Sequence, residues 1–390
     1  MISAAVLMVL AACGQKDGDQ AALSTQDSAP AQLVSGIALE NMDKSIAPGD
    51  DFFMFMNGAW IDNTEIPADK ASYGGFGILG DESQERVKAI IEESATGDFP
   101  KGSPEQKVGD LYKSYMDWDA RNARGVEPLQ PELKRIAAIK DRDDLAVYFA
   151  EAIERGLDAP LGMTQFADLK RPTHYGIYLF QSGLGLPDRE FYFNTDEKSV
   201  EIRNKYVEHI QKMFELAEMP NGGAAAKTIM ALETKLADKN MKKEDTRNWA
   251  ANYNKVALDK LPELMPNFNW DGYLETAQVD PEVTDGIVVV TTDYIKALDG
   301  IIENTDLDTW KTYLNWVALN NRASMLNQAL DQQNFAFYGT TISGTEEQQP
   351  MWRRAVATVN NNLGEVVGEV YVKRHFPPEA KERMLELVGN

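Results

Sequence analysis

Residues 103–116 read SPEQKVGDLYKSYM, a stretch that predicts a helix with one face against a hydrophobic core. Ser103 is a favourable N-cap, Pro104 suits the first helical position, and Gln106 can close a capping box. Apolar side chains then recur at the helical spacing: Val108, Leu111, Tyr112, Tyr115 and Met116. The same spacing dominates the chain beyond about Ile37, so we expect a mainly α-helical protein.

Two later segments repeat this pattern, and only two segments predict strands. One helical segment carries Trp310, Tyr313, Leu314 and Val317, and the other runs from Trp352 to Tyr371 and predicts a long, heavily buried helix. The strand candidates are THYGIYLFQSG at 173–183 and GIVVVTT at 286–292, both rich in β-branched or aromatic residues. The expected fold class is therefore mainly α with minor β.

Length and composition limit the classes of protein to which the chain can belong. A chain of 390 residues is long enough for more than one domain, since single cores stop growing at about 250–300 residues. Hydrophobic residues make up 43% of the chain, which indicates a globular protein. The 61 acidic against 39 basic residues give a formal net charge of −22, which argues against nucleic acid as a partner.

The N-terminus predicts a lipoprotein signal segment over residues 1–12. Its apolar run is shorter than the ~20 residues that span a bilayer, and Leu10 to Cys13 matches a bacterial lipobox, in which the cysteine thiol is acylated after cleavage. Gly14 fits delivery to the outer membrane of a Gram-negative cell, so we expect a membrane anchor in the periplasm or cell envelope. A buried free thiol at Cys13 is the alternative, and the missing Lys or Arg before the apolar run leaves the start codon open. Residues 13–38 are polar and small, as in a flexible tether.

Four stretches carry a resemblance to a known family. They read PGDDFFMFMNGAWIDNTEIPADKASYGGFGIL (48–79), GLGLPDREFYF (183–193), FYGTTISGTEEQQPMWRRAVATVN (337–360) and VGEVYVKRHFPPEAK (367–381). In this order they are similar to the neprilysin and endothelin-converting-enzyme family of zinc metallopeptidases, which includes bacterial oligopeptidases.

The resemblance implies two helical lobes. In that family the catalytic lobe is built from both ends of the chain, and a second helical lobe covers the active-site chamber. By analogy, residues 39–240 would form the N-terminal part of the catalytic lobe and residues 241–390 most of the covering lobe. The charged stretch Lys235–Asn248 is the candidate junction, and a solvated helix end is the alternative interpretation.

The histidines do not make a zinc site of the expected type. That family binds zinc through an HExxH helix and a downstream Glu, so that two imidazoles one turn apart face one metal. His174, His209 and His375 are isolated from one another, and His209 lies among apolar positions that predict an ordinary packed helix. We expect no metal ligand and no catalytic residue in this chain, and the resemblance implies that the zinc site follows Asn390.

Residues 75–80 read GFGILG and match the GxGxxG pattern of dinucleotide sites. Such a site needs a buried strand before the glycines, and residues 65–73 do not predict one, so the match is treated as chance. By the resemblance, the aromatic ring of Phe76 forms the pocket for the substrate side chain after the scissile bond; a core position is the alternative. Ser72 and Gly77 stand where some members carry an Arg that clamps a substrate's terminal carboxylate and an Asp that holds this Arg. Without that pair, the resemblance implies cleavage within peptides.

The sequence thus predicts the N-terminal portion of a zinc metalloendopeptidase that hydrolyses small peptides, itself inactive without the zinc-binding half. The motifs Asn57–Trp60, Leu186–Arg189 and Trp352–Arg354 are interpreted as architectural. Two alternatives remain open: a non-catalytic helical lipoprotein that binds peptides or a protein partner, and a solute-binding lipoprotein unrelated to peptidases.

Overall fold

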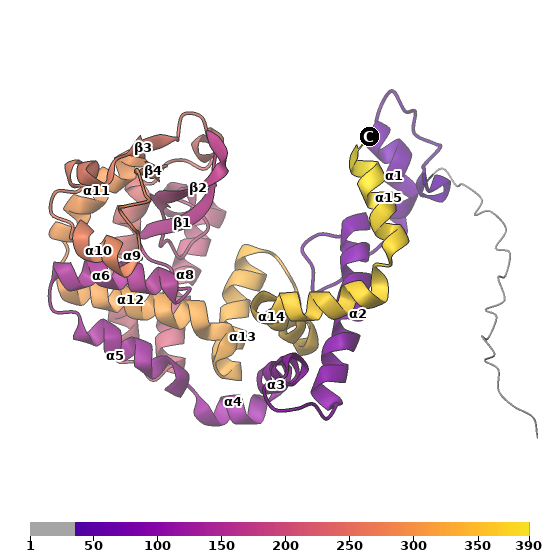
Figure 1. Ribbon diagram of the computed structural model, residues 1–390, viewed down its shortest axis with the longest axis horizontal. Coiled ribbons are helices and arrows are strands. Elements are labelled where there is room, and N and C mark those ends of the chain that lie inside the picture. The colour runs from indigo at the N-terminus through magenta and orange to yellow at the C-terminus, as the bar shows by residue number, and fades with distance from the viewer. Residues whose placement is uncertain (1–35, 390) are drawn as a thin grey trace, which may run out of the picture. The chain divides into compact units, whose positions relative to one another are not determined.

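The computed structural model describes residues 36–389, of which most are helical (Figure 1). Of the described residues, 63% are helical, with one small four-stranded sheet, which confirms the expected fold class. Of the described residues, 36–65 and 66–389 form two compact units, which are described separately. The predicted signal segment, Cys13 and nearly all of the predicted tether lie outside the described residues.

The first unit contains a short 3-10 helix, η1 (Leu39–Asn41), and helix α1 (Phe52–Asp62). Asp51 caps α1 by accepting a hydrogen bond from the backbone N–H of Met54 at 2.9 Å. The helix sequence FFMFMNGAWID is apolar on every side, and Phe52 and Phe53 are each 65% exposed. A helix apolar all round is normally buried, so α1 presents more apolar surface than this unit covers.

The second unit has two hydrophobic cores, of which the smaller is made by α2 (Gly75–Thr96), α3 (Pro104–Met116) and α14 (Met351–His375). The Ser103 side chain accepts from the N–H of Gln106 at 3.2 Å, as predicted. Gln106 closes the box one residue earlier than expected, by accepting from the N–H of Gly102 at 2.8 Å. Gly109 lets α3 approach α2 closely, since a Cβ there would stand 2.3 Å from the carbonyl oxygen of Ser94.

Helix α14 is long, as predicted, but it is heavily buried only in its first half. Its backbone leaves helical geometry at Leu363 (φ −134°), which divides it into two straight parts. Val356 and Val359 before this kink are fully buried, whereas Val367 is the only buried residue after it. Helix α15 (Pro378–Gly389) follows and buries no residue.

The larger core is built from the helices between α3 and α14. Trp310, Tyr313 and Leu314 of α12 lie at its centre, which confirms the predicted inward face. The α-helices around it are α4 (Trp118–Arg124), α5 (Gln130–Ala138), α6 (Arg142–Glu154), α7 (Glu190–Phe193), α8 (Glu197–Leu216), α9 (Gly222–Lys239), α10 (Trp270–Thr276), α11 (Thr292–Glu303), α12 (Leu307–Arg322) and α13 (Gln328–Asn334). The short 3-10 helices are η2 (Glu127–Leu129), η3 (Asp245–Arg247), η4 (Leu258–Glu263) and η5 (Ala323–Met325), and a π-helix, η6 (Phe335–Ile342), continues α13.

The larger core takes side chains from both sides of residue 240, so the boundary between residues 39–240 and 241–390 does not coincide with a division between cores. Leu236 and Ala237 at the end of α9 are buried in the same core as Leu261. The charged stretch 235–248 contains the end of α9 and the η3 turn, which fits the alternative interpretation of a solvated helix end. Charge on the outer face of a helix end carries no information about which core the inner face joins.

The sheet lies against one side of the larger core (Figure 1). Its strands are β1 (Leu161–Asp168), β2 (Arg171–Gln181), β3 (Asn254–Val256) and β4 (Ile287–Val289), in the order β1-β2-β4-β3. The two predicted strands are confirmed as β2 and β4, which pair in parallel with Leu179 opposite Val289. The sequence did not predict β1, which forms an antiparallel hairpin with β2, or the short β3.

Candidate functional site

Helix α2 begins with the GFGILG segment and projects two apolar side chains into solvent. Gly74 is its N-cap, and Phe76 in the first turn is 94% exposed, with Leu79 one turn later at 62%. The alternative that Phe76 is a core residue is therefore wrong. Residues 66–74 before the glycines form turns and contain no strand, so the structure lacks the strand-turn-helix arrangement of a dinucleotide site here.

An ion-pair network holds the segment before α2 in place. The Lys70 Nζ lies 2.5 Å from the Asp81 carboxylate, and the Arg353 guanidinium of α14 contacts the same carboxylate at 3.0 Å. The hydrogen bond from Lys70, helped by both positive charges, lowers the pKa of Asp81. Arg353 also lies 3.8 Å from Asp69, and the carbonyl of Ala68 accepts from the N–H groups of residues 346 and 347 at 3.1 and 3.0 Å. These contacts hold the start of α2, which carries Phe76, against α14.

In the Trp352–Arg354 motif, Trp352 packs against the smaller core and Arg354 connects the two cores. The Arg354 guanidinium donates to both oxygens of Asp331 on α13, at 2.8 and 2.9 Å, and Asp331 is only 2% exposed. The Gln348 side chain donates to the same carboxylate at 3.2 and 3.3 Å. The Lys88 ammonium lies 4.2 Å from the centre of the Trp352 ring. These contacts give the motif the architectural role that the sequence predicts.

The GLGLPDREFYF motif surrounds a buried carboxyl group, that of Glu233 on α9. Glu233 is 1% exposed, and the Tyr192 hydroxyl donates to its Oε2 at 2.7 Å. The Tyr206 hydroxyl lies 3.0 and 2.9 Å from the two carboxyl oxygens, and the N–H of Gly185 donates as well. Burial raises the pKa of Glu233 to about 7, against the lowering effect of these hydrogen bonds.

This network fixes the loop of the motif. Tyr192 accepts from the N–H of Leu186 at 3.1 Å, and Tyr313 donates to the carbonyl of Gly183 at 2.6 Å. A Cβ on Gly185 would stand 1.7 Å from the Tyr206 hydroxyl, so only glycine fits there. Glu233 was not among the residues predicted from sequence, although its position between Ile229 and Leu236 on the apolar side of a helix was a usable signal.

The three histidines lie on separate elements: His174 on β2, His209 on α8 and His375 at the end of α14. His209 is 2% exposed and stacks on Phe337 with ring centres 4.8 Å apart. Burial lowers the pKa of His209 to about 3, so its ring is neutral, and the predicted structural role is confirmed. Within residues 36–389 no group of three His, Cys, Asp or Glu side chains lies close enough to hold a metal ion.

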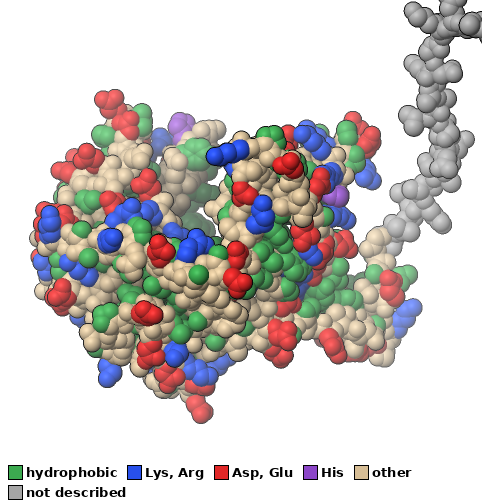
Figure 2. All heavy atoms as spheres, turned by 90° about the horizontal axis from the view of Figure 1, so that it is seen from below, with side chains coloured by type: hydrophobic (Ala, Val, Ile, Leu, Met, Phe, Trp, Pro, Cys, Tyr) green, Lys and Arg blue, Asp and Glu red, His purple; other side chains and the backbone are tan. Residues whose placement is uncertain are grey.

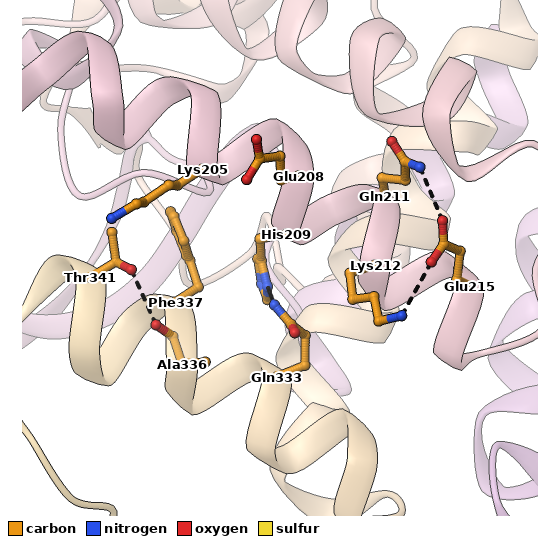
Figure 3. A pocket seen from close by; sticks show the side chains of 10 residues that line it. All are labelled: Lys205, Glu208, His209, Gln211, Lys212, Glu215, Gln333, Ala336, Phe337 and Thr341. Atoms are coloured by element: carbon orange, nitrogen blue, oxygen red, sulfur yellow. Dashed lines mark hydrogen bonds and ion pairs between the residues drawn. The ribbon is translucent and has the colours of Figure 1, made fainter.

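A pocket of about 430 Å³ lies between α8 and η6, beside His209 (Figure 3). Three of its four charged side chains form ion pairs: Lys212 lies 3.4 Å from Glu215, and Lys205 lies 2.7 Å from Glu201. The fourth, Glu208, is exposed. The Gln333 side chain reaches the Nδ1 of His209 at 3.2 Å, as the close-up shows. The neutral, stacked imidazole of His209 is therefore not an activated base.

Comparison with known proteins gives the chain a family. The model of peptidase family M13 matches residues 48–390. The human protein called membrane metallo-endopeptidase-like 1 is 27% identical over 376 residues, covering 90% of this chain and 48% of the relative. Human endothelin-converting enzyme 1 is 25% identical over 405 residues, covering 100% of this chain and 51% of the relative. The chain therefore spans about half the length of the curated relatives it matches.

A solved structure agrees with these sequence matches. The zinc metalloprotease Zmp1 of Mycobacterium tuberculosis, determined in complex with an inhibitor, superposes with a TM-score of 0.84 at 33% identity. The match covers 91% of this chain and 54% of that one. Among the described residues of this chain, no helix has the length and apolar character needed to cross a bilayer.

Proposed function

The chain belongs to peptidase family M13, and from that membership we propose that it is the N-terminal portion of a zinc metalloendopeptidase that hydrolyses small peptides. The observation that carries this proposal is the family match from residue 48 to residue 390, together with coverage of only about half of each relative. The zinc, its ligands and the general base would be supplied by residues that follow Asn390. This membership argues against a solute-binding lipoprotein unrelated to peptidases.

We assign the two cores to the two lobes expected in this family. The smaller core, with α2 and α14, would belong to the catalytic lobe, and the larger core would be the covering lobe. The supporting observation is that α2 and α14, far apart in sequence, share the smaller core, while the intervening residues build the larger one. Phe76 would then face the chamber between the lobes, and the absence of an Arg at position 72 would favour cleavage within peptides.

The first test concerns zinc and activity. The purified chain should retain no stoichiometric zinc after dialysis and should cleave no peptide, because the described residues bring no three metal ligands together. A longer chain that continues past Asn390 through an HExxH helix should bind one equivalent of zinc and cleave a fluorogenic peptide. Metal analysis and a peptidase assay with a chelator measure both. Chelator-sensitive cleavage by the short chain would contradict the proposal.

The second test concerns Phe76. In the active longer chain, Phe76→Ala should lower kcat/KM about 10- to 100-fold for peptides with a large apolar residue after the scissile bond, since burying an aromatic side chain contributes about 1.5–3 kcal/mol. Peptides with glycine at that position should lose little. Phe166→Ala is the matched control, because Phe166 is 60% exposed but lies on β1. Equal loss for both peptide classes would reject the assignment.

The third test concerns the anchor. We propose that Cys13, which lies outside the described residues, is lipidated and holds the protein in the cell envelope of a Gram-negative bacterium. Labelled palmitate should be incorporated on expression in such a host, and Cys13→Ser should abolish labelling and release the protein into the periplasm. Equal labelling of the variant would reject the lipobox.

A further inference from the structure

A second groove, outside every feature used above, lies on the larger core. Its volume is about 610 Å³, within the range of ligand sites in proteins. It forms where η4 meets α10 and the turn that follows α10. The apolar side chains that line it are Leu258, Pro262, Trp270, Leu274, Val279 and Pro281.

The rim of this groove is acidic. Asp259, Asp271, Glu275 and Asp280 all line it and are exposed, and the residues that line it include no Lys or Arg. The neighbouring Lys260 pairs instead with Glu263 at 2.9 Å. On the face drawn in Figure 2, by contrast, acidic and basic side chains are interspersed. The groove is thus a local concentration of negative charge beside an apolar floor.

The arrangement of these acidic side chains is electrostatically unfavourable when no ligand is bound. Asp271 and Glu275 are four residues apart on α10, so their charges repel across one helical turn. Glu275 also lies in the last turn of the helix, where the helix dipole disfavours a negative charge. Gln278 just beyond has a left-handed backbone (φ 56°), and this turn allows the N–H of Val279 to bond to the carbonyl of Leu274 at 2.9 Å. A bound cation would relieve the repulsion.

A single metal ion does not fit this charge pattern, because no three carboxylates in the described chain lie close enough to share one. Positive charges distributed along a ligand with apolar groups between them match both the rim and the floor. We propose that the groove binds a cationic amphipathic peptide segment, whose apolar side chains enter the groove while its Lys or Arg side chains face the four acids. Binding requires no zinc and no catalysis, so its test is independent of the proposed peptidase function.

The experiment measures binding of a fluorescently labelled Leu/Lys amphipathic peptide to the full chain by anisotropy. The triple variant Asp259→Asn/Asp271→Asn/Glu275→Gln should weaken binding about tenfold, since three exposed charge pairs together account for a change of that size. Charge reversal in Asp271→Lys/Glu275→Lys should abolish binding. All of these residues are exposed, and circular dichroism verifies that the variants remain folded.

The matched control removes the same number of charges elsewhere. Glu365→Gln/Glu382→Gln/Glu386→Gln, on α14 and α15, should leave the affinity within about twofold of the parent chain. Equal loss in both triple variants would overturn the proposal, because the peptide would then respond only to net charge. Equally tight binding of a peptide with Gln in place of Lys would also overturn it, as would dimerisation of the chain through this groove without peptide binding.

Discussion

Replacing Asp331 by alanine should lower the free energy of unfolding by about 3–5 kcal/mol, the cost of leaving a buried charge unpaired. Asp331 is 2% exposed, and the Arg354 side chain that it binds is 17% exposed. Without the carboxylate, the guanidinium of Arg354 and the amide of Gln348 lose the acceptor that both share. Because Asp331 lies on α13 and Arg354 on α14, the loss also weakens the connection between the two cores.

Urea unfolding followed by circular dichroism measures this effect. Arg374→Ala is the control, since Arg374 and Glu93 form an exposed pair at 2.7 Å whose removal should change the stability far less. The double variant Asp331→Leu/Arg354→Met should recover much of the stability, because it removes both charges at once. A loss below about 1 kcal/mol for Asp331→Ala would show that water reaches the pair.

The contribution of Glu233 to the stability of the chain should fall as pH rises from about 4.5 to 7. Burial raises the pKa of Glu233 from 4.5 to about 7, so the folded chain binds a proton that the unfolded chain releases over this interval. Below the unfolded pKa both states are protonated and the contribution is fully present; it is lost as pH rises through the folded pKa. The shift corresponds to about 3 kcal/mol at its full extent.

Glu233→Gln isolates this contribution, because the amide has a similar shape but does not titrate. Its free energy of unfolding, relative to that of the parent chain, should increase by up to about 3 kcal/mol between pH 4.5 and 7.5. Poorer hydrogen bonding of the amide with the Tyr192 and Tyr206 hydroxyls lowers the free energy of unfolding by the same amount at every pH and does not change the slope. Glu365→Gln, an exposed control, should keep the parent slope. Parallel curves for the parent chain and Glu233→Gln would contradict the buried-carboxyl assignment.

Local sequence patterns determined the elements of this protein. The Ser103 cap, the inward face of α12 and the strands β2 and β4 follow from side-chain chemistry within a few residues, so they could be predicted. The same holds for the structural role of His209, because its apolar neighbours on one helix already indicate burial. Four ordered stretches of sequence likewise carried the family resemblance, which the family model over residues 48–390 bears out.

Only the tertiary structure decided which side chains meet across long separations in the chain. The helical pattern can place Glu233 on an inward face, but only the fold brings the tyrosines of α7 and α8 to its carboxyl group. Asp331 and Arg354 pair between helices from different cores. The sequence left open whether Phe76 lies in a core or lines a substrate pocket, and the structure shows it exposed. Burial and pairing depend on which elements pack together, and helical periodicity specifies an inward face without specifying its partner.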